Sequence, residues 1–144
     1  MSNSLTVCVD ASIVIRFTIG QDDVAVMQLW KSWASQEAHM VAPTLLFYEV
    51  TNGLYQQQKN GRLSPGFVRE ALDVILAFPI ELIGDPALQR RARELAARYN
   101  LPASYDAHYL ALADRMGIEL WTADARLVKA LLPFKLDWVK LAAG

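Results

Sequence analysis

Short apolar runs alternate along the chain with longer segments in which apolar residues recur at helical spacing. Residues 5–15 read as a short buried strand followed by a turn, because β-branched residues are dense around Asp10. Further short apolar runs predict strands at residues 39–42, 80–83, 118–122 and 136–141. The chain is therefore expected to supply about five strands.

The segments between these strands have the periodicity of amphipathic helices. The predicted helices cover residues 23–35, 43–59, 64–76, 85–100, 105–116 and 125–132. Local signals support several of their ends: Pro43 suits a first turn, Ser104 and Asp124 suit N-caps, and Gly117 suits a C-cap. In the third of these helices Val68, Leu72, Ile75 and Leu76 are expected to face the core.

Strands that alternate with helices of ten or more residues indicate βαβ units, and hence an α/β fold with helices on both faces of a mainly parallel sheet. Residues 1–144 contain no repeat, low-complexity tract or linker, so one domain is expected. In such sheets ligands bind beyond the carboxyl ends of the strands, where the strand order reverses. Asp10 and Asp124 both follow predicted strands and should lie at that edge.

The composition narrows the possible classes of protein. With 53% hydrophobic and 20% charged residues, the chain is typical of an ordered globular protein. A single cysteine, Cys8, excludes an intrachain disulfide and a cysteine-based zinc cluster, and is expected to be a buried thiol. The longest stretch without an acidic or basic residue, 38–48, is too short to span a membrane, so a cytoplasmic location is predicted. The net charge of −1 neither supports nor excludes a nucleic-acid substrate.

Four acidic residues are candidates for chemistry, although each also has a structural explanation. Asp10 lies between apolar residues and could form a turn, while Glu49 lies on the apolar face of its helix or could reach water from its edge. Asp106 falls in a first helical turn, where the helix dipole favours an acid by roughly 0.3–1 kcal/mol. Asp124 could serve only as an N-cap.

Together the four acids favour a different interpretation. Two carboxylates about 4 Å apart repel by ~4 kcal/mol at an effective dielectric of 20, so a cluster needs cations or shared protons. Oxygen ligands without cysteine favour magnesium or manganese over zinc. Such ions bind phosphodiesters and activate water, which is the chemistry of nucleases.

Four segments carry a resemblance to a known family. Residues 9–14 (VDASIV), 42–54 (APTLLFYEVTNGL), 101–113 (LPASYDAHYLALA) and 121–127 (WTADARL) resemble, in order, the four motifs of PIN-domain nucleases. The size and layout are similar to VapC-type toxins of toxin–antitoxin pairs. The resemblance implies a three-layer α/β/α fold and a Mg²⁺- or Mn²⁺-dependent endoribonuclease, usually a homodimer, which an antitoxin neutralises.

The same resemblance assigns roles to individual residues. By motif position Asp10, Glu49, Asp106 and Asp124 are the acidic set, and Asp10 and Asp106 are the best candidates for direct metal ligands. Ser12 and Thr122 match hydroxyl positions near the site. Arg16 matches a position that often carries a basic residue for phosphate contact, and a solvated surface charge is an equal alternative for it.

Other prominent side chains are expected to be structural. His39 and His108 hold no motif position, Trp30 and Trp33 have the spacing of a core or dimer face, and the arginines between residues 90 and 98 suit a charged helix face.

Two other functions stay open at this point: a PIN nuclease that matures or degrades RNA without an antitoxin, and a non-catalytic binding module whose acids are only caps. A haloacid dehalogenase-type phosphatase needs a second Asp where this chain has Ser12.

Overall fold

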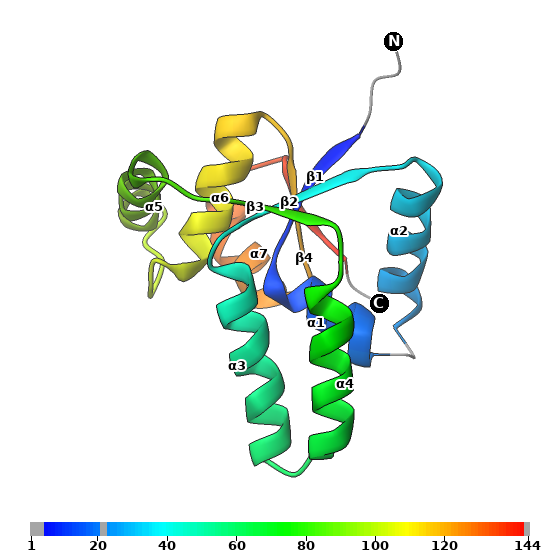
Figure 1. The fold of residues 1–144 in the computed structure, drawn as a ribbon. Helices are drawn as coiled ribbons and strands as arrows, with labels where there is room; N and C mark the ends of the chain where they lie inside the picture. The colour runs from blue at the N-terminus through cyan, green and yellow to red at the C-terminus, as the bar shows by residue number, and fades with distance from the viewer. Residues whose placement is uncertain (1–4, 21–22, 143–144) are drawn as a thin grey trace.

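The computed structural model describes residues 5–20 and 23–142, which form five strands, seven α-helices and one 3₁₀ helix (Figure 1). The strands are β1 (Thr6–Val9), β2 (His39–Pro43), β3 (Ile80–Ile83), β4 (Glu119–Thr122) and β5 (Val139–Leu141). The helices are α1 (Ala11–Ile19), α2 (Val24–Ser35), α3 (Leu46–Lys59), α4 (Pro65–Leu76), α5 (Pro86–Arg98), α6 (Tyr105–Met116), α7 (Ala125–Leu131) and the 3₁₀ helix η1 (Leu132–Phe134).

All five strands are parallel and lie in the order β3-β2-β1-β4-β5. Right-handed crossovers from β1 to β2 to β3 place α1–α4 on one face, and the crossovers to β4 and β5 place α5–α7 on the other. Figure 1 shows α2 and α6 on opposite sides of the sheet. The predicted three-layer α/β/α fold with a parallel sheet is confirmed.

The strand order reverses between β1 and β4. The chain moves outward from β1 through β2 to β3, and then returns to the other side of β1 with β4 and β5. This reversal is the position at which doubly wound sheets open a crevice beyond their carboxyl ends. The residues that follow β1 and β4 are therefore placed beside one another at the functional edge of the sheet.

The core lies on both sides of the central strands. Val7, Cys8 and Val9 of β1 are fully buried, and α6, whose Leu110 and Leu112 are also fully buried, packs against β1, β2 and β4. Burial raises the pKa of the Cys8 thiol far above its ordinary value, which makes it unreactive and confirms the expected buried thiol.

The two tryptophans of α2 belong to the core, as one of the alternatives predicted. Trp33 is buried, and Trp30 stacks on Phe17 with ring centroids 4.2 Å apart. Phe78 lies against both rings of that stack. This aromatic cluster joins α1 and α2 to the segment that leads into β3.

The prediction of a strand and turn over residues 5–15 was wrong in its second half. Strand β1 ends at Val9, and α1 begins directly at Ala11 with Asp10 as its N-cap. The residues Ile13, Val14 and Ile15 have strand-like composition, but Ile13 and Val14 are fully buried and, of the other residues in this helix, only Arg16 is exposed. A short helix covered on nearly all sides loses the periodicity that separates it from a strand.

Several predicted boundaries also need correction. Pro43 is the last residue of β2, and α3 begins three residues later. Ser104 stands at the N-cap position of α6 but makes no capping hydrogen bond through its side chain. Leu76, expected to face the core, is 49% exposed, and β5 covers only the second half of residues 136–141.

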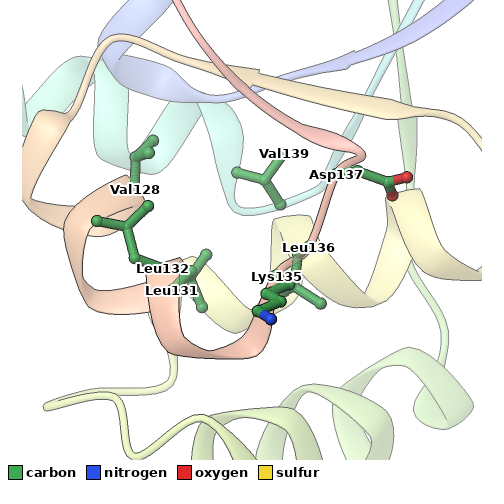
Figure 2. A pocket seen from close by; sticks show the side chains of 7 residues that line it. All are labelled: Val128, Leu131, Leu132, Lys135, Leu136, Asp137 and Val139. Atoms are coloured by element: carbon green, nitrogen blue, oxygen red, sulfur yellow. The ribbon is translucent and has the colours of Figure 1, made fainter.

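Near the C-terminal end of the described chain, α7, η1 and the segment entering β5 enclose a cavity of about 250 Å³ (Figure 2). Its lining is mainly aliphatic, with Lys135 and Asp137 at its edge, and none of the candidate site residues takes part. No helix in residues 5–20 and 23–142 is long and apolar enough to cross a membrane.

Candidate active site

Asp10 connects the central strand to the first helix. Its carboxylate Oδ1 accepts a hydrogen bond from the backbone N–H of Ile13, 3.2 Å away, so it caps α1 as the turn interpretation expected. The residue is only 5% exposed. Burial raises its pKa from 3.8 to about 6, although hydrogen bonds from the Ser12 and Thr122 side chains and from Ile13 partly oppose this rise.

Ser12 and Thr122 link Asp10 to the end of β4. The Ser12 hydroxyl donates to Asp10 Oδ1 at 2.6 Å and lies 3.2 Å from Thr122 Oγ1. The backbone N–H of Ala123 donates to Ser12 Oγ at 2.9 Å, and that of Asp124 donates to Thr122 Oγ1 at 3.0 Å. These bonds fasten the ends of β1 and β4 together and fix the orientation of the Asp10 carboxylate.

Glu49 lies in the first turn of α3 and is half-buried, as its position on an apolar face predicted. Tyr109 of α6 donates a hydrogen bond from its phenol to Glu49 Oε1 at 2.6 Å. Burial raises the pKa of Glu49, the bond from Tyr109 lowers it, and the charge of Asp106 raises it again. The Tyr109 ring is itself 1% exposed, so this bond holds the glutamate from a rigid position.

Asp106 and Asp124 begin α6 and α7. Asp106 is in the first turn of α6, and Asp124 caps α7 by accepting the Arg126 N–H at 2.9 Å. Burial raises the pKa of Asp106, and the nearby charge of Asp124 raises it further. Asp124 therefore caps α7, and its charge also lies close enough to Asp106 to raise the pKa of that residue.

Asp106 is the carboxylate that interacts electrostatically with each of the other three acids. Its charge raises the pKa of both Asp10 and Glu49, and it responds in turn to Asp124. The four acids therefore form one electrostatic cluster at the edge where the strand order reverses. Because like charges there disfavour one another, the cluster is a strong potential site for cations.

A divalent cation suits this donor set. The cluster offers carboxylate oxygens, with hydroxyl oxygens behind them, and these hard ligands match Mg²⁺ or Mn²⁺. Among the described residues, no three Cys, His, Asp or Glu side chains already converge on a common ion position. Magnesium requires no such cage, since it usually keeps several waters and takes one or two carboxylates from the protein.

The remaining predicted side chains lie outside the cluster. Arg16 contacts Asp23 of the α2 N-cap at 3.5 Å, and half of its side chain is exposed. His39 pairs with Glu81 on the surface at 3.1 Å. Arg91 joins Glu94 to Asp114, which is the charged helix face that was expected.

Tyr109 was missed by the sequence reasoning. The signal for it was its position three residues after Asp106, which puts the two side chains on one face of α6. A tyrosine among the buried aliphatic residues of a helix needs a partner for its hydroxyl. Here Glu49 is that partner.

Comparison of the sequence with models of known protein families identifies the family of the chain. The family model for the PIN domain matches residues 7–130, which include all four acids. The chain belongs to the PIN domain family. PIN domains are nuclease domains that generally use divalent metal ions, in agreement with the donor set. No curated protein sequence matches the chain.

Solved structures support the same PIN fold. A protein from Pyrobaculum aerophilum is 22% identical with a TM-score of 0.64, over 90% of this chain and 87% of that one. A chain of a toxin–antitoxin complex from Klebsiella pneumoniae is 20% identical with a TM-score of 0.62, over 94% and 97%. VapC20 from Mycobacterium tuberculosis, a toxin that cleaves the sarcin–ricin loop, is 19% identical with a TM-score of 0.63, over 86% and 94%.

The buried charge of Asp10 makes metal-free stability depend on pH. Because the folded state raises the pKa of Asp10 from 3.8 to about 6, its contribution to the free energy of unfolding is full below pH 4 and is lost as pH rises through 6. The loss is at most about 3 kcal/mol. Urea unfolding in chelator should therefore show Asp10→Asn gaining stability over wild type from pH 4.5 to 7.5. Asparagine keeps the capping oxygen, and parallel pH profiles for the two proteins would contradict the assignment.

Proposed function

We propose that this PIN domain is a metal-dependent endoribonuclease that hydrolyses RNA phosphodiester bonds and serves as the toxin of a toxin–antitoxin pair. The observation that carries the catalytic part is the coupling of Asp10, Glu49 and Asp124 through Asp106 at the edge where the strand order reverses. A cluster of partly buried carboxylates lowers the stability of the fold unless bound cations offset the repulsion between the charges.

Each side chain of the cluster has a role in this proposal. Asp10 and Asp106 hold the cation, with Glu49 and Asp124 completing the negative field around it. A bound Mg²⁺ or Mn²⁺ supplies Lewis-acid polarisation of the phosphate and lowers the pKa of water. In hydrolysis the water oxygen bonds to phosphorus, the phosphorus–oxygen ester bond breaks, and the leaving oxygen takes a proton.

The hydroxyl and phenol groups position these carboxylates and touch no reacting atom. Ser12 donates to Asp10 and accepts from Ala123, so the Asp10 carboxylate is held in one orientation. Tyr109 does the same for Glu49. Preorganised donors of this kind spare the site from reorganising during the reaction.

The toxin role rests on the structural relatives. One of them is a toxin that cleaves the sarcin–ricin loop, and another belongs to a toxin–antitoxin complex. We therefore infer an antitoxin as a partner, and a homodimer as the assembly. A short DNA-binding reading frame next to the gene would favour this role over an RNA-maturing nuclease.

Divalent metal should stabilise the native protein by mass action, because only the folded chain assembles the cluster. We expect Mn²⁺ to raise the melting temperature of wild type, and Asp10→Asn or Asp106→Asn to reduce that rise. Asp73→Asn, at an exposed position of α4, is the matched control and should respond like wild type. Equal metal-induced shifts in all four proteins, measured by differential scanning fluorimetry, would exclude a shared site.

Glu49→Gln tests membership of the cluster by removing one charge while keeping the shape. Cleavage of a mixed RNA pool in Mn²⁺ should fall strongly, because an amide supplies neither charge nor basicity. Far-UV circular dichroism should show an intact fold, and Glu70→Gln on the surface of α4 should cleave normally. Full cleavage by folded Glu49→Gln would remove this residue from the site.

Expression in bacteria tests the toxin role. Wild type produced without an antitoxin should arrest growth, while Asp10→Asn at equal protein level should be tolerated. Growth curves with matched immunoblots measure both. Harmless expression of wild type that cleaves RNA in vitro would instead assign the chain to RNA maturation or degradation.

A further inference from the structure

A second cavity, of about 230 Å³, opens between the first turns of α3 and α6. Leu45 and Tyr48 line it from the start of α3, and Tyr105 and His108 line it from α6. We call this cavity the base pocket. Its far wall comes from the ends of β2 and β3 and from α5, through residues that include Thr44, Gly84 and Gln89.

The base pocket and the acid cluster occupy neighbouring faces of the same helix. On α6, Tyr105 and His108 are three residues apart and face the pocket, whereas Asp106 and Tyr109 are three residues apart and face the cluster. The two pairs are shifted by one residue, which is about 100° around an α-helix. The pocket and the cluster therefore lie on adjacent faces of α6.

Helix α3 repeats this arrangement. Tyr48 lines the pocket, and the next residue, Glu49, belongs to the cluster. On both α3 and α6, therefore, a tyrosine that lines the pocket directly precedes an acid of the cluster.

The aromatic side chains at this pocket are unusually accessible. Tyr48 is 76% exposed and Tyr105 is 60% exposed, and the two come from different helices. Accessible tyrosine rings offer flat apolar faces together with a polar tip. In proteins that bind single strands, such rings stack on bases of any identity.

The lining of the pocket combines apolar residues with a few polar side chains. None of its lining residues is Asp, Glu, Lys or Arg. Among the described residues, no hydrogen bond joins the side chains of His108 or Gln89 to the protein. Polar side chains of this kind suit the edge of a nucleobase, whereas a phosphate would favour a lysine or arginine, and the pocket has neither.

Size restricts the occupant further. The cavity is smaller than the ~300–1,000 Å³ of pockets for drug-sized ligands, so one planar ring system fits better than a folded peptide segment. Gly84 lies against Thr44, where an added Cβ would stand 2.8 Å from the Thr44 methyl group. The wall between β2 and β3 is therefore closely packed and gives the pocket a fixed shape.

We propose that the base pocket binds one unstacked nucleobase of single-stranded RNA and so sets which phosphate reaches the acid cluster. The inference rests on the proposed function, because it assumes that the cluster acts on RNA. Tyr48 and Tyr105 stack on the base, while His108 and Gln89 contact its edge. Duplex RNA, whose bases are already stacked and paired, does not use the pocket.

The test compares two exposed tyrosines that line the pocket with one exposed tyrosine that does not. Tyr48→Ala and Tyr105→Ala remove a stacking face, and Tyr55→Ala is the control because Tyr55 is 51% exposed on the same α3 helix and does not line the pocket. Affinity is measured by fluorescence anisotropy with a short single-stranded phosphorothioate RNA in Mg²⁺. The first two variants should bind about tenfold more weakly or worse, and Tyr55→Ala should stay within about twofold of wild type.

An abasic RNA of the same length separates base contacts from backbone contacts. Wild type should bind it more weakly than normal RNA, and Tyr48→Ala and Tyr105→Ala should cause no further loss. Equal affinity of all four proteins for normal RNA overturns the base pocket and leaves the cavity for a protein side chain. Losses that persist with abasic RNA also overturn it.

Cleavage kinetics distinguish a failure of this inference from a failure of the proposed function. If wild type binds single-stranded RNA through the two tyrosines but does not hydrolyse it, the base pocket is supported and the proposed nuclease function is overturned. If wild type cleaves RNA and the KM is unchanged in Tyr48→Ala and Tyr105→Ala, the nuclease function is supported and the base pocket is overturned. Absence of RNA binding by wild type overturns both.

Discussion

The burial of the Asp10 carboxylate among other acids is the constraint on which the site depends. Burial of this carboxylate, which is 5% exposed, raises its pKa to about 6, so the charge that it carries at neutral pH costs folding free energy. The chain lessens this cost with hydrogen bonds from Ser12 and Ile13, yet it keeps Asp106, whose charge acts on both Asp10 and Glu49. A fold optimised only for stability would not retain this repulsion, and a bound cation would convert it into attraction.

The four acidic residues of the site all lie at the N-terminal ends of helices, along one edge of the sheet. Helices α1, α3, α6 and α7 each bring one acid to this edge, at an N-cap or in a first turn. The positive end of the helix dipole also favours an acid at these positions. Because adjacent residues on a helix point in different directions, α3 and α6 add tyrosines beside the acids at no cost to the cluster. The same helix ends can therefore hold both the acids proposed for hydrolysis and the tyrosines proposed to bind a base.

Much of this architecture could be predicted from the sequence, because strands and amphipathic helices differ in period. The parallel five-stranded sheet followed from that alternation, and the half-buried position of Glu49 followed from its apolar face. Helix α1 could not be recognised, since Ile13, Val14 and Ile15 look the same in a buried helix and in a strand. The role of Tyr109 and the base pocket could not be predicted for another reason. Each depends on contacts between α3 and α6, and no local sequence pattern indicates such contacts.

The central claim is that the four acids form a single cation site where β1 and β4 separate. Diffraction at the manganese absorption edge, from crystals grown with Mn²⁺, tests it without reference to activity. The account predicts an anomalous peak in contact with the carboxylates of Asp10 and Asp106, with Glu49 and Asp124 around it. A manganese peak bound elsewhere on the protein, with this cluster empty, would contradict the account.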